Sequence, residues 1–113
     1  MAKKDETLLQ EKVLKYFKTL QLSGHPIFYD RRVAGGLSYE EGVPDIYCVY
    51  NGVHIEIELK VVGGAVRARQ EAFERKCRNW GILYIRPDTY KEVVEYFEKR
   101  IIPLLGGGDQ KWN

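Results

Sequence analysis

The sequence predicts a single α/β domain in which helices flank a mixed sheet, in the order α-β-β-β-α-β-α. Apolar residues recur at helical spacing near both ends of the chain, whereas apolar and polar residues alternate in its middle, as they do in strands. The length of 113 residues and the hydrophobic share of 44% suit one globular domain. We expect this domain to span 1–113, with a core over about 5–105 and a flexible tail over 106–113.

The first third of the chain predicts a helix, a strand and a long loop. Apolar residues at helical spacing indicate a helix over about 6–22, and Asp5 is a suitable N-cap for it. The stretch IFYDRRV (27–33) favours a strand. The glycines that follow, and Pro44, indicate a loop that leads into the middle of the chain.

The middle of the chain predicts a β-hairpin. The runs DIYCVY (45–50) and VHIEIELK (53–60) are rich in strand-forming residues and are joined by Asn51-Gly52. This pair suits a two-residue type I′ turn, in which both positions need a positive φ. Side chains alternate along a strand, so one face of the second strand carries the polar set His54, Glu56, Glu58 and Lys60.

The last third predicts a helix, a strand and a final helix. A basic helix is expected over 66–80, with Gly81 in the position that favours glycine after a helix. The stretch GILYIRP (81–87) reads as a buried strand, and Asp88 is a suitable N-cap for a helix over 89–105. A crossover through the basic helix makes the sheet mixed.

Charge and cysteine content exclude several classes of protein. The 18 Lys and Arg residues against 16 Asp and Glu leave a formal net charge of +2, so overall charge does not indicate a polyanion partner. Cys48 and Cys77 form no C-x-x-C motif, which argues against a zinc site or disulfide framework and fits a reducing cytosol. The chain lacks an apolar run of the ~20 residues that span a membrane, and it lacks a signal-peptide core. We therefore expect a cytoplasmic protein with no membrane partner.

The hairpin brings two acids together. Counting outward from the turn pairs Tyr50 with Val53 and sets Asp45 opposite Glu58. Directly opposed residues have Cβ atoms about 4.5–5.5 Å apart, so both carboxylates can share one ion. A hard cation such as Mg²⁺ takes a few carboxylate oxygens plus waters and activates water for phosphodiester hydrolysis. Lys60, two residues beyond Glu58 on the same face, can orient that water or stabilise a phosphate oxygen.

A second interpretation gives these charges no chemical role. A bare E-x-K more often marks the solvated face of an edge strand, where charge prevents unwanted pairing. However, two acids directly opposite each other repel unless a positive charge lies between them. The pairing of Asp45 with Glu58 therefore favours the cation site.

These motifs resemble a known family. GVPD (42–45), IELK (57–60) and a following helix that carries Gln70 resemble the PD-(D/E)xK nuclease superfamily. In the form G-x-P-D … E-x-K … Q they resemble the virus-type replication-repair nuclease (VRR-Nuc) domain, over about 5–98. The resemblance implies a restriction-endonuclease-like fold and dependence on Mg²⁺ or Mn²⁺.

The resemblance also implies roles for individual residues. Asp45, Glu58 and the backbone carbonyl of Leu59 would bind the metal, Lys60 would be catalytic, and Gln70 would lie at the active site. Stand-alone members are homodimers associated with cleavage of branched DNA, including four-way (Holliday) junctions, and occur in phages and bacteria. The cell implied is therefore bacterial or phage-infected.

The family has an active-site glutamate on its first helix, and the sequence offers Glu6 and Glu11. At 100° per residue, Glu6 lies near the apolar stripe of that helix, whereas Glu11 points almost to the opposite side. We therefore prefer Glu6, although an acid at a helix N-terminus also has a purely structural use. We expect Glu56 to be a solvated carboxylate and His54 to be structural.

Arginines near the predicted site are candidates for phosphate contacts, which give salt-sensitive binding without base specificity. They lie in the first strand and the basic helix: Arg31, Arg32, Arg67, Arg69 and Arg75. Two other functions remain open at this point. One is a non-catalytic nucleic-acid-binding module on the same fold, and the other is a nuclease that acts on flaps or ends. A protein-interaction adaptor is the weakest alternative, because it would need none of these polar residues.

Overall fold

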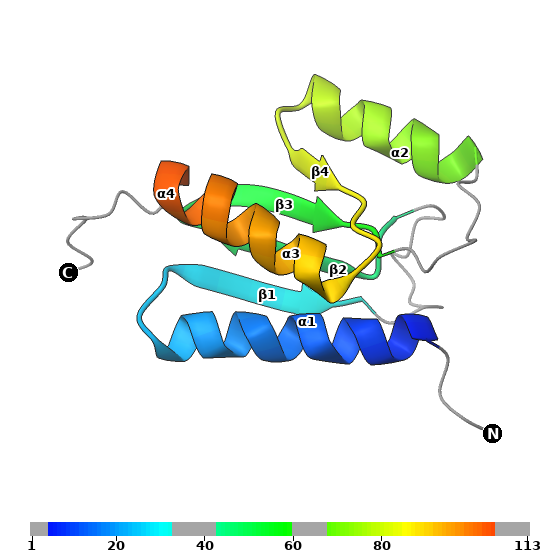
Figure 1. The fold of residues 1–113 in the computed structure, drawn as a ribbon. Helices are drawn as coiled ribbons and strands as arrows, with labels where there is room; N and C mark the ends of the chain where they lie inside the picture. The colour runs from blue at the N-terminus through cyan, green and yellow to red at the C-terminus, as the bar shows by residue number, and fades with distance from the viewer. Residues whose placement is uncertain (1–4, 33–42, 60–67, 106–113) are drawn as a thin grey trace.

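The structure, a computed structural model, describes residues 5–32, 43–59 and 68–105. Its elements follow the predicted α-β-β-β-α-β-α order, which is confirmed (Figure 1). They are α1 (Asp5–Leu22), β1 (Ile27–Arg31), β2 (Ile46–Tyr50), β3 (Val53–Ile57), α2 (Ala68–Asn79), β4 (Leu83–Ile85), α3 (Tyr90–Tyr96), η1 (Phe97–Ile101) and α4 (Ile102–Leu105). The last predicted helix is thus one α-helix interrupted by the π-helical segment η1.

The four strands form one mixed sheet in the order β1-β2-β3-β4. The first three strands are antiparallel neighbours, and β4 pairs parallel to β3 after the crossover through α2. β3 therefore lies in the interior of the sheet. The alternative interpretation, in which β3 is an edge strand with a solvated charged face, was wrong. β4 pairs with the edge of β3 that β2 leaves open.

The β2–β3 hairpin has the predicted turn and register. Asn51 and Gly52 have φ values of 50° and 84°, as a type I′ turn requires. Tyr50 pairs with Val53, and the ladder continues without a bulge to Ile46 opposite Ile57. The register that places Asp45 beside Glu58 is confirmed up to this last strand pair.

The core lies between one face of the sheet and the helices α1, α3 and η1. Figure 1 shows α1 running along β1 and α3 crossing in front of the central strands. The buried residues of this core include Val13, Phe17, Leu20, Ile46, Cys48, Tyr50, Ile55, Ile57, Val93, Phe97 and Ile101. α1 is held there by an apolar stripe at helical spacing.

α2 is attached in a different way, beside β4. Its buried residues are Glu74 and Cys77. Glu74 accepts hydrogen bonds from Arg78 on the same helix and from Arg86 just after β4, both at 2.5 Å. Phe73 packs against Tyr84 with ring centroids 6.3 Å apart. α2 is therefore held beside β4 by the ion pair between Glu74 and Arg86, by the buried Cys77 and by the contact between Phe73 and Tyr84.

Two helix boundaries test the sequence predictions. Gly81 has a φ of 75° just after α2, so the predicted glycine C-cap is confirmed. The predicted N-cap Asp88 was wrong by one residue, because the Thr89 side chain accepts from the Glu92 backbone N–H. The backbone N–H of Asp88 instead donates to the Glu92 side chain, as in a capping box displaced by one residue.

Some predictions lie outside the described residues, including those on Lys60, Arg67 and the tail over 106–113. Within the described part of the chain, no helix has the length and apolar character needed to cross a membrane.

Candidate functional site

The candidate site lies where the strands end, at the residues that follow β1 and β3 and precede β2. The backbone N–H of Arg32 donates to the carbonyl of Asp45 at 2.6 Å, and the N–H of Glu58 donates to Ile85 at 2.9 Å. The first bond prolongs the pairing of β1 with β2 by one residue, and the second prolongs the pairing of β3 with β4. Extending each of the three strand registers by one residue gives a row across the sheet: Arg32, Asp45, Glu58 and Arg86.

This row has a charge pattern that suits a cation site. Two acids on neighbouring strands lie in the middle and an arginine lies at each end. Adjacent acids repel each other unless a positive charge lies between them, and a bound cation would supply that charge. Glu58 is only 8% exposed, whereas Asp45 is half-buried. A carboxylate buried to this extent needs polar partners.

A glutamine from a separate helix contacts each acid. Gln10 on α1 donates from Nε2 to Oδ2 of Asp45 at 3.1 Å. Gln70 on α2 donates from Nε2 to Oε2 of Glu58 at 2.9 Å. An ionised carboxylate has about four lone-pair sites, so an amide hydrogen bond and a cation can be accepted together. These contacts fix the orientation of the two acids.

The sequence analysis selected Gln70 but did not select Gln10. Gln10 is 8% exposed and lies three residues before the core residue Val13, on the buried side of α1. The available signal is a polar residue on the apolar stripe of a helix, a position where a side chain needs a buried polar partner. Glu6 lies one turn before Gln10 and is exposed, as is Glu11.

Tyr84 adds an unusual feature beside Glu58. In the described part of the chain, its hydroxyl is a buried side-chain oxygen without a hydrogen-bond partner. Burial raises the pKa of this hydroxyl well above its usual value, and the negative charge of Glu58 raises it further. The group therefore stays protonated. Buried hydroxyls in proteins are generally hydrogen-bonded to protein groups or ordered water, so this one is suited to binding a water at the site.

The donor set fits Mg²⁺ or Mn²⁺. Among the described residues, no three His, Cys, Asp or Glu side chains gather in a way that could hold a metal ion. Mg²⁺ does not need such a cage, because it typically uses one or two carboxylates and keeps several waters. Asp45 and Glu58 supply two carboxylates, and the buried hydroxyl of Tyr84 offers a partner for a water. Leu59, whose carbonyl is a further predicted ligand, follows Glu58 directly and is buried.

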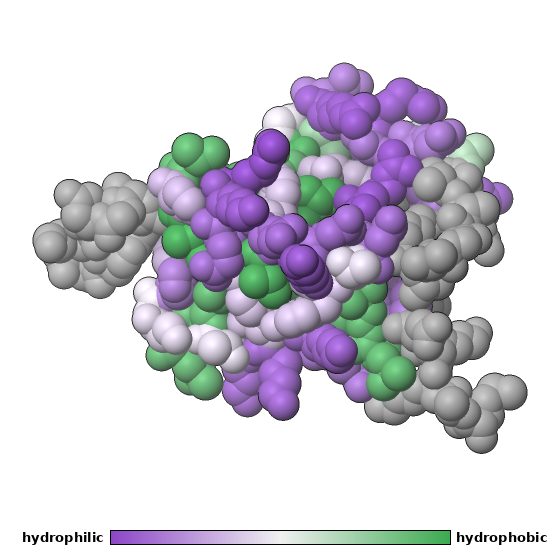
Figure 2. Space-filling view, in the orientation of Figure 1, coloured by the Kyte–Doolittle hydropathy of each residue, from purple (hydrophilic) through white to green (hydrophobic). Residues whose placement is uncertain are grey.

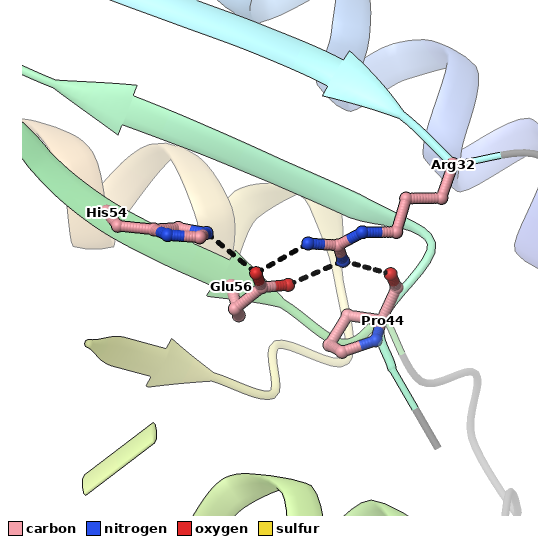
Figure 3. Close-up of polar contacts among 4 residues, drawn as sticks. All are labelled: Arg32, Pro44, His54 and Glu56. Atoms are coloured by element: carbon pink, nitrogen blue, oxygen red, sulfur yellow. Dashed lines mark hydrogen bonds and ion pairs between the residues drawn. The ribbon is translucent and has the colours of Figure 1, made fainter. Parts of the chain in front are cut away.

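The environment of Glu56 differs from the predicted one. Glu56 is 1% exposed, so its interpretation as a solvated carboxylate was wrong. Its carboxylate is bound by Arg32 and His54, and Arg32 also reaches Pro44 (Figure 3). The predicted structural role of His54 agrees with this contact. The guanidinium of Arg32, a candidate for phosphate contact, is thus engaged inside the protein.

Other candidate arginines lie on the surface. Arg31 is exposed at the end of β1, and Arg69 and Arg75 are exposed on α2. Figure 2 shows hydrophilic side chains over α2, at the upper right. Arg69 and Arg75 lie on the same helix as Gln70, and Arg31 directly precedes Arg32.

Comparison with solved structures identifies the fold. The chain is similar to a structure described as "VRR_NUC domain", with a TM-score of 0.67 and 18% sequence identity. The match covers 84% of this chain and 96% of that one. No family model and no curated protein matches the sequence. The fold is that of a VRR_NUC domain, which confirms the restriction-endonuclease-like α/β architecture expected from the motifs.

Proposed function

We propose that this chain, which has the fold of a VRR_NUC domain, is a metal-dependent PD-(D/E)xK endonuclease that hydrolyses phosphodiester bonds in branched DNA. The observation that carries the proposal is the placement of Asp45 and Glu58 on neighbouring strands, each held by a glutamine amide from a different helix. The motif spacing in the sequence and the fold support the same activity.

The carboxylates of Asp45 and Glu58 would hold Mg²⁺ or Mn²⁺, together with the backbone carbonyl of Leu59. When bound, the cation neutralises phosphate charge and lowers the pKa of an attacking water. Gln10 and Gln70 keep the two acids in fixed orientations, which reduces the reorganisation needed when charge develops during the reaction. The Tyr84 hydroxyl, which stays protonated, is available to donate a hydrogen bond to a water beside Glu58.

Two further roles rest on the sequence. Lys60, two residues beyond Glu58 in the sequence, would orient the attacking water or stabilise a phosphate oxygen with its ammonium group. Glu6 would contact water at the site from the exposed N-terminal turn of α1, one turn before Gln10.

DNA would be held through its phosphates. Arg31, Arg69 and Arg75 are exposed, and Arg67 precedes Arg69 and Arg75 in the sequence. Contacts of this kind weaken steeply with salt and carry no base specificity. Cutting both strands of a symmetric four-way junction requires two active sites, so a two-fold homodimer is the simplest assembly.

The test is a cleavage panel of a four-way junction, a flap, a nicked duplex and a linear duplex, each with Mg²⁺ or Mn²⁺. We expect cleavage of branched DNA, and we expect Glu58→Gln to lower the rate by about 100-fold or more, as losing a group that stabilises developing charge does. Glu95→Gln, which changes an exposed glutamate on α3, serves as the control and should cut at the wild-type rate.

Two outcomes would contradict the proposal. The first is cleavage that Glu58→Gln leaves unchanged, which would point to a contaminating nuclease. The second is DNA binding that ignores chelator and is never followed by cleavage. That second result would favour a non-catalytic binding module, for which the exposed arginines of α2 are the supporting observation.

A further inference from the structure

Glu56 is a buried charge beside the candidate site. It lies in β3, one residue before the strand ends, is 1% exposed, and pairs with Tyr47 on β2 and Tyr84 on β4. An ionised carboxylate in such a place is costly unless it is paired and hydrogen-bonded. Its cationic partner is therefore held close to it by a strong interaction.

Arg32 is that partner. Its Nη1 and Nη2 donate to Oε1 and Oε2 of Glu56, both at 2.7 Å, in a two-pronged pair (Figure 3). His54 Nε2 lies 2.7 Å from the same Oε2 atom. The guanidinium also lies over the ring of Tyr47, 4.6 Å from its centroid. The carboxylate and the aromatic ring together fix the plane of the guanidinium.

Arg32 also binds the backbone on both sides of Asp45. Its Nη1 donates to the carbonyl of Pro44 at 2.7 Å, and its own backbone N–H donates to the carbonyl of Asp45 at 2.6 Å. These two carbonyls flank the Cα atom from which the Asp45 side chain departs. Pro44 is fully buried, and its ring fixes φ, so the segment has little freedom before Asp45.

We propose that Arg32 and Glu56 form a clamp that fixes the backbone around Asp45 and so sets the position of the Asp45 carboxylate. Glu56 orients the guanidinium, and the guanidinium holds Pro44. Arg32 is a positioning residue in this account and touches neither DNA nor the metal. The inference rests on the proposed function, because it assigns the clamp to one acid of the proposed cation site.

Stability alone is a weak reason for such a network. Replacing a buried ion pair with apolar residues of similar volume is often neutral or stabilising, whereas removing one partner is costly. The clamp instead gives geometric precision to a carboxylate that lies outside the regular strand. Ligands supported in this way typically lose 10–100-fold in metal affinity or activity when the support is removed.

The decisive variant is Arg32→Lys, which keeps the positive charge. A lysine ammonium lacks the planar fork needed to hold both Glu56 oxygens and the Pro44 carbonyl together. We expect the Mn²⁺ affinity of the Arg32→Lys protein, measured by calorimetric titration, to be about 10-fold or more below that of the wild type, while the fold is retained. The double variant Arg32→Met with Glu56→Gln removes both charges of the pair. A purely electrostatic role predicts wild-type Mn²⁺ affinity in this variant and in Arg32→Lys, whereas the clamp predicts a loss in both.

A second readout does not depend on metal or activity. The Gln10 side-chain amide donates to Asp45, so its NMR signals report where that carboxylate lies. Arg32→Lys should shift these signals. Glu74→Gln is the matched control, because Glu74 is also a buried acid held by two cations, and it should leave them unchanged.

The results separate the clamp from the proposed function. If the wild type binds Mn²⁺ and Arg32→Lys binds it within two-fold, with unshifted Gln10 signals, the clamp is overturned and the nuclease proposal stands. If the wild type shows no Mn²⁺ binding, the nuclease proposal fails. In that case shifted Gln10 signals in Arg32→Lys still support the clamp as a structural device, and unshifted signals overturn it.

Discussion

The two acids of the candidate site are supported in different ways. Asp45 receives its amide from Gln10 on α1, a helix anchored by a stripe of fully buried apolar residues, and its backbone is bound by Arg32. Glu58 accepts a hydrogen bond from Gln70 on α2, a helix whose buried residues are Glu74 and Cys77 and whose Glu74 pairs with Arg86 after β4. One half of the site is therefore built on the hydrophobic core, and the other half on an ion-pair network at the end of the sheet.

The two kinds of support predict different responses to mutation. The apolar core is closely packed, so removing a core residue of α1 should lower the stability of the whole molecule. A helix attached by few apolar contacts can open locally, at a lower free energy than global unfolding. The contact from Gln70 to Glu58 should therefore open more readily than the contact from Gln10 to Asp45.

The largest effect should come from the anchors of the two helices. Phe17→Ala removes a fully buried ring from α1 and should lower the free energy of unfolding by about 3–5 kcal/mol, measured by urea denaturation. Glu74→Gln removes the charge that holds Arg86 and should cost less, about 1–3 kcal/mol, with faster amide hydrogen exchange confined to α2. Faster exchange spread evenly over α1 and α2 in Glu74→Gln would contradict the proposed difference.

The next largest effect concerns the two glutamines. Gln10→Leu and Gln70→Leu each remove a hydrogen bond to an acid, and each should lower the cleavage rate about 10–100-fold. Gln21→Leu is the matched control on α1, because Gln21 donates to the carbonyl of Ile27, away from the site. A normal rate in Gln10→Leu together with a slow one in Gln70→Leu would mean that Glu58 alone holds the cation.

The smallest effect concerns Tyr84, and its sign is informative. Tyr84→Phe removes a buried hydroxyl that lacks a partner in the described part of the chain, so the metal-free protein should gain about 1 kcal/mol of stability. The same variant should cleave DNA more slowly if the hydroxyl holds a water beside Glu58. Thermal denaturation and cleavage assays measure the two effects. A loss of stability in metal-free Tyr84→Phe would show that the hydroxyl already has a partner.

The sequence predicted the fold order and the pairing of the acids because both depend on local signals. Asn51 and Gly52 determine the turn, and the turn determines the register that brings Asp45 beside Glu58. Gln70 was found through a motif that lies close to Glu58 in the sequence. These inferences did not require knowledge of how distant elements pack.

The supports of Asp45 could not be read in the same way. Gln10 lies 35 residues before Asp45, and Arg32 lies 24 residues before Glu56, so both contacts depend on tertiary packing. Glu56 was assigned to solvent because alternation along a strand shows which face a side chain is on, but not what covers that face. The β1–β2 register, which brings Arg32 to Asp45, has no turn signal comparable to Asn-Gly.

In the proposed site, Asp45 and Glu58 together hold one divalent cation. Calorimetric titration of Mn²⁺ into the wild type and into the double variant Asp45→Asn with Glu58→Gln tests this shared coordination. We predict saturable binding in the wild type and none in the double variant, with circular dichroism showing that both are folded. Equal binding in the two proteins, or no binding in a folded wild type, would contradict the claim.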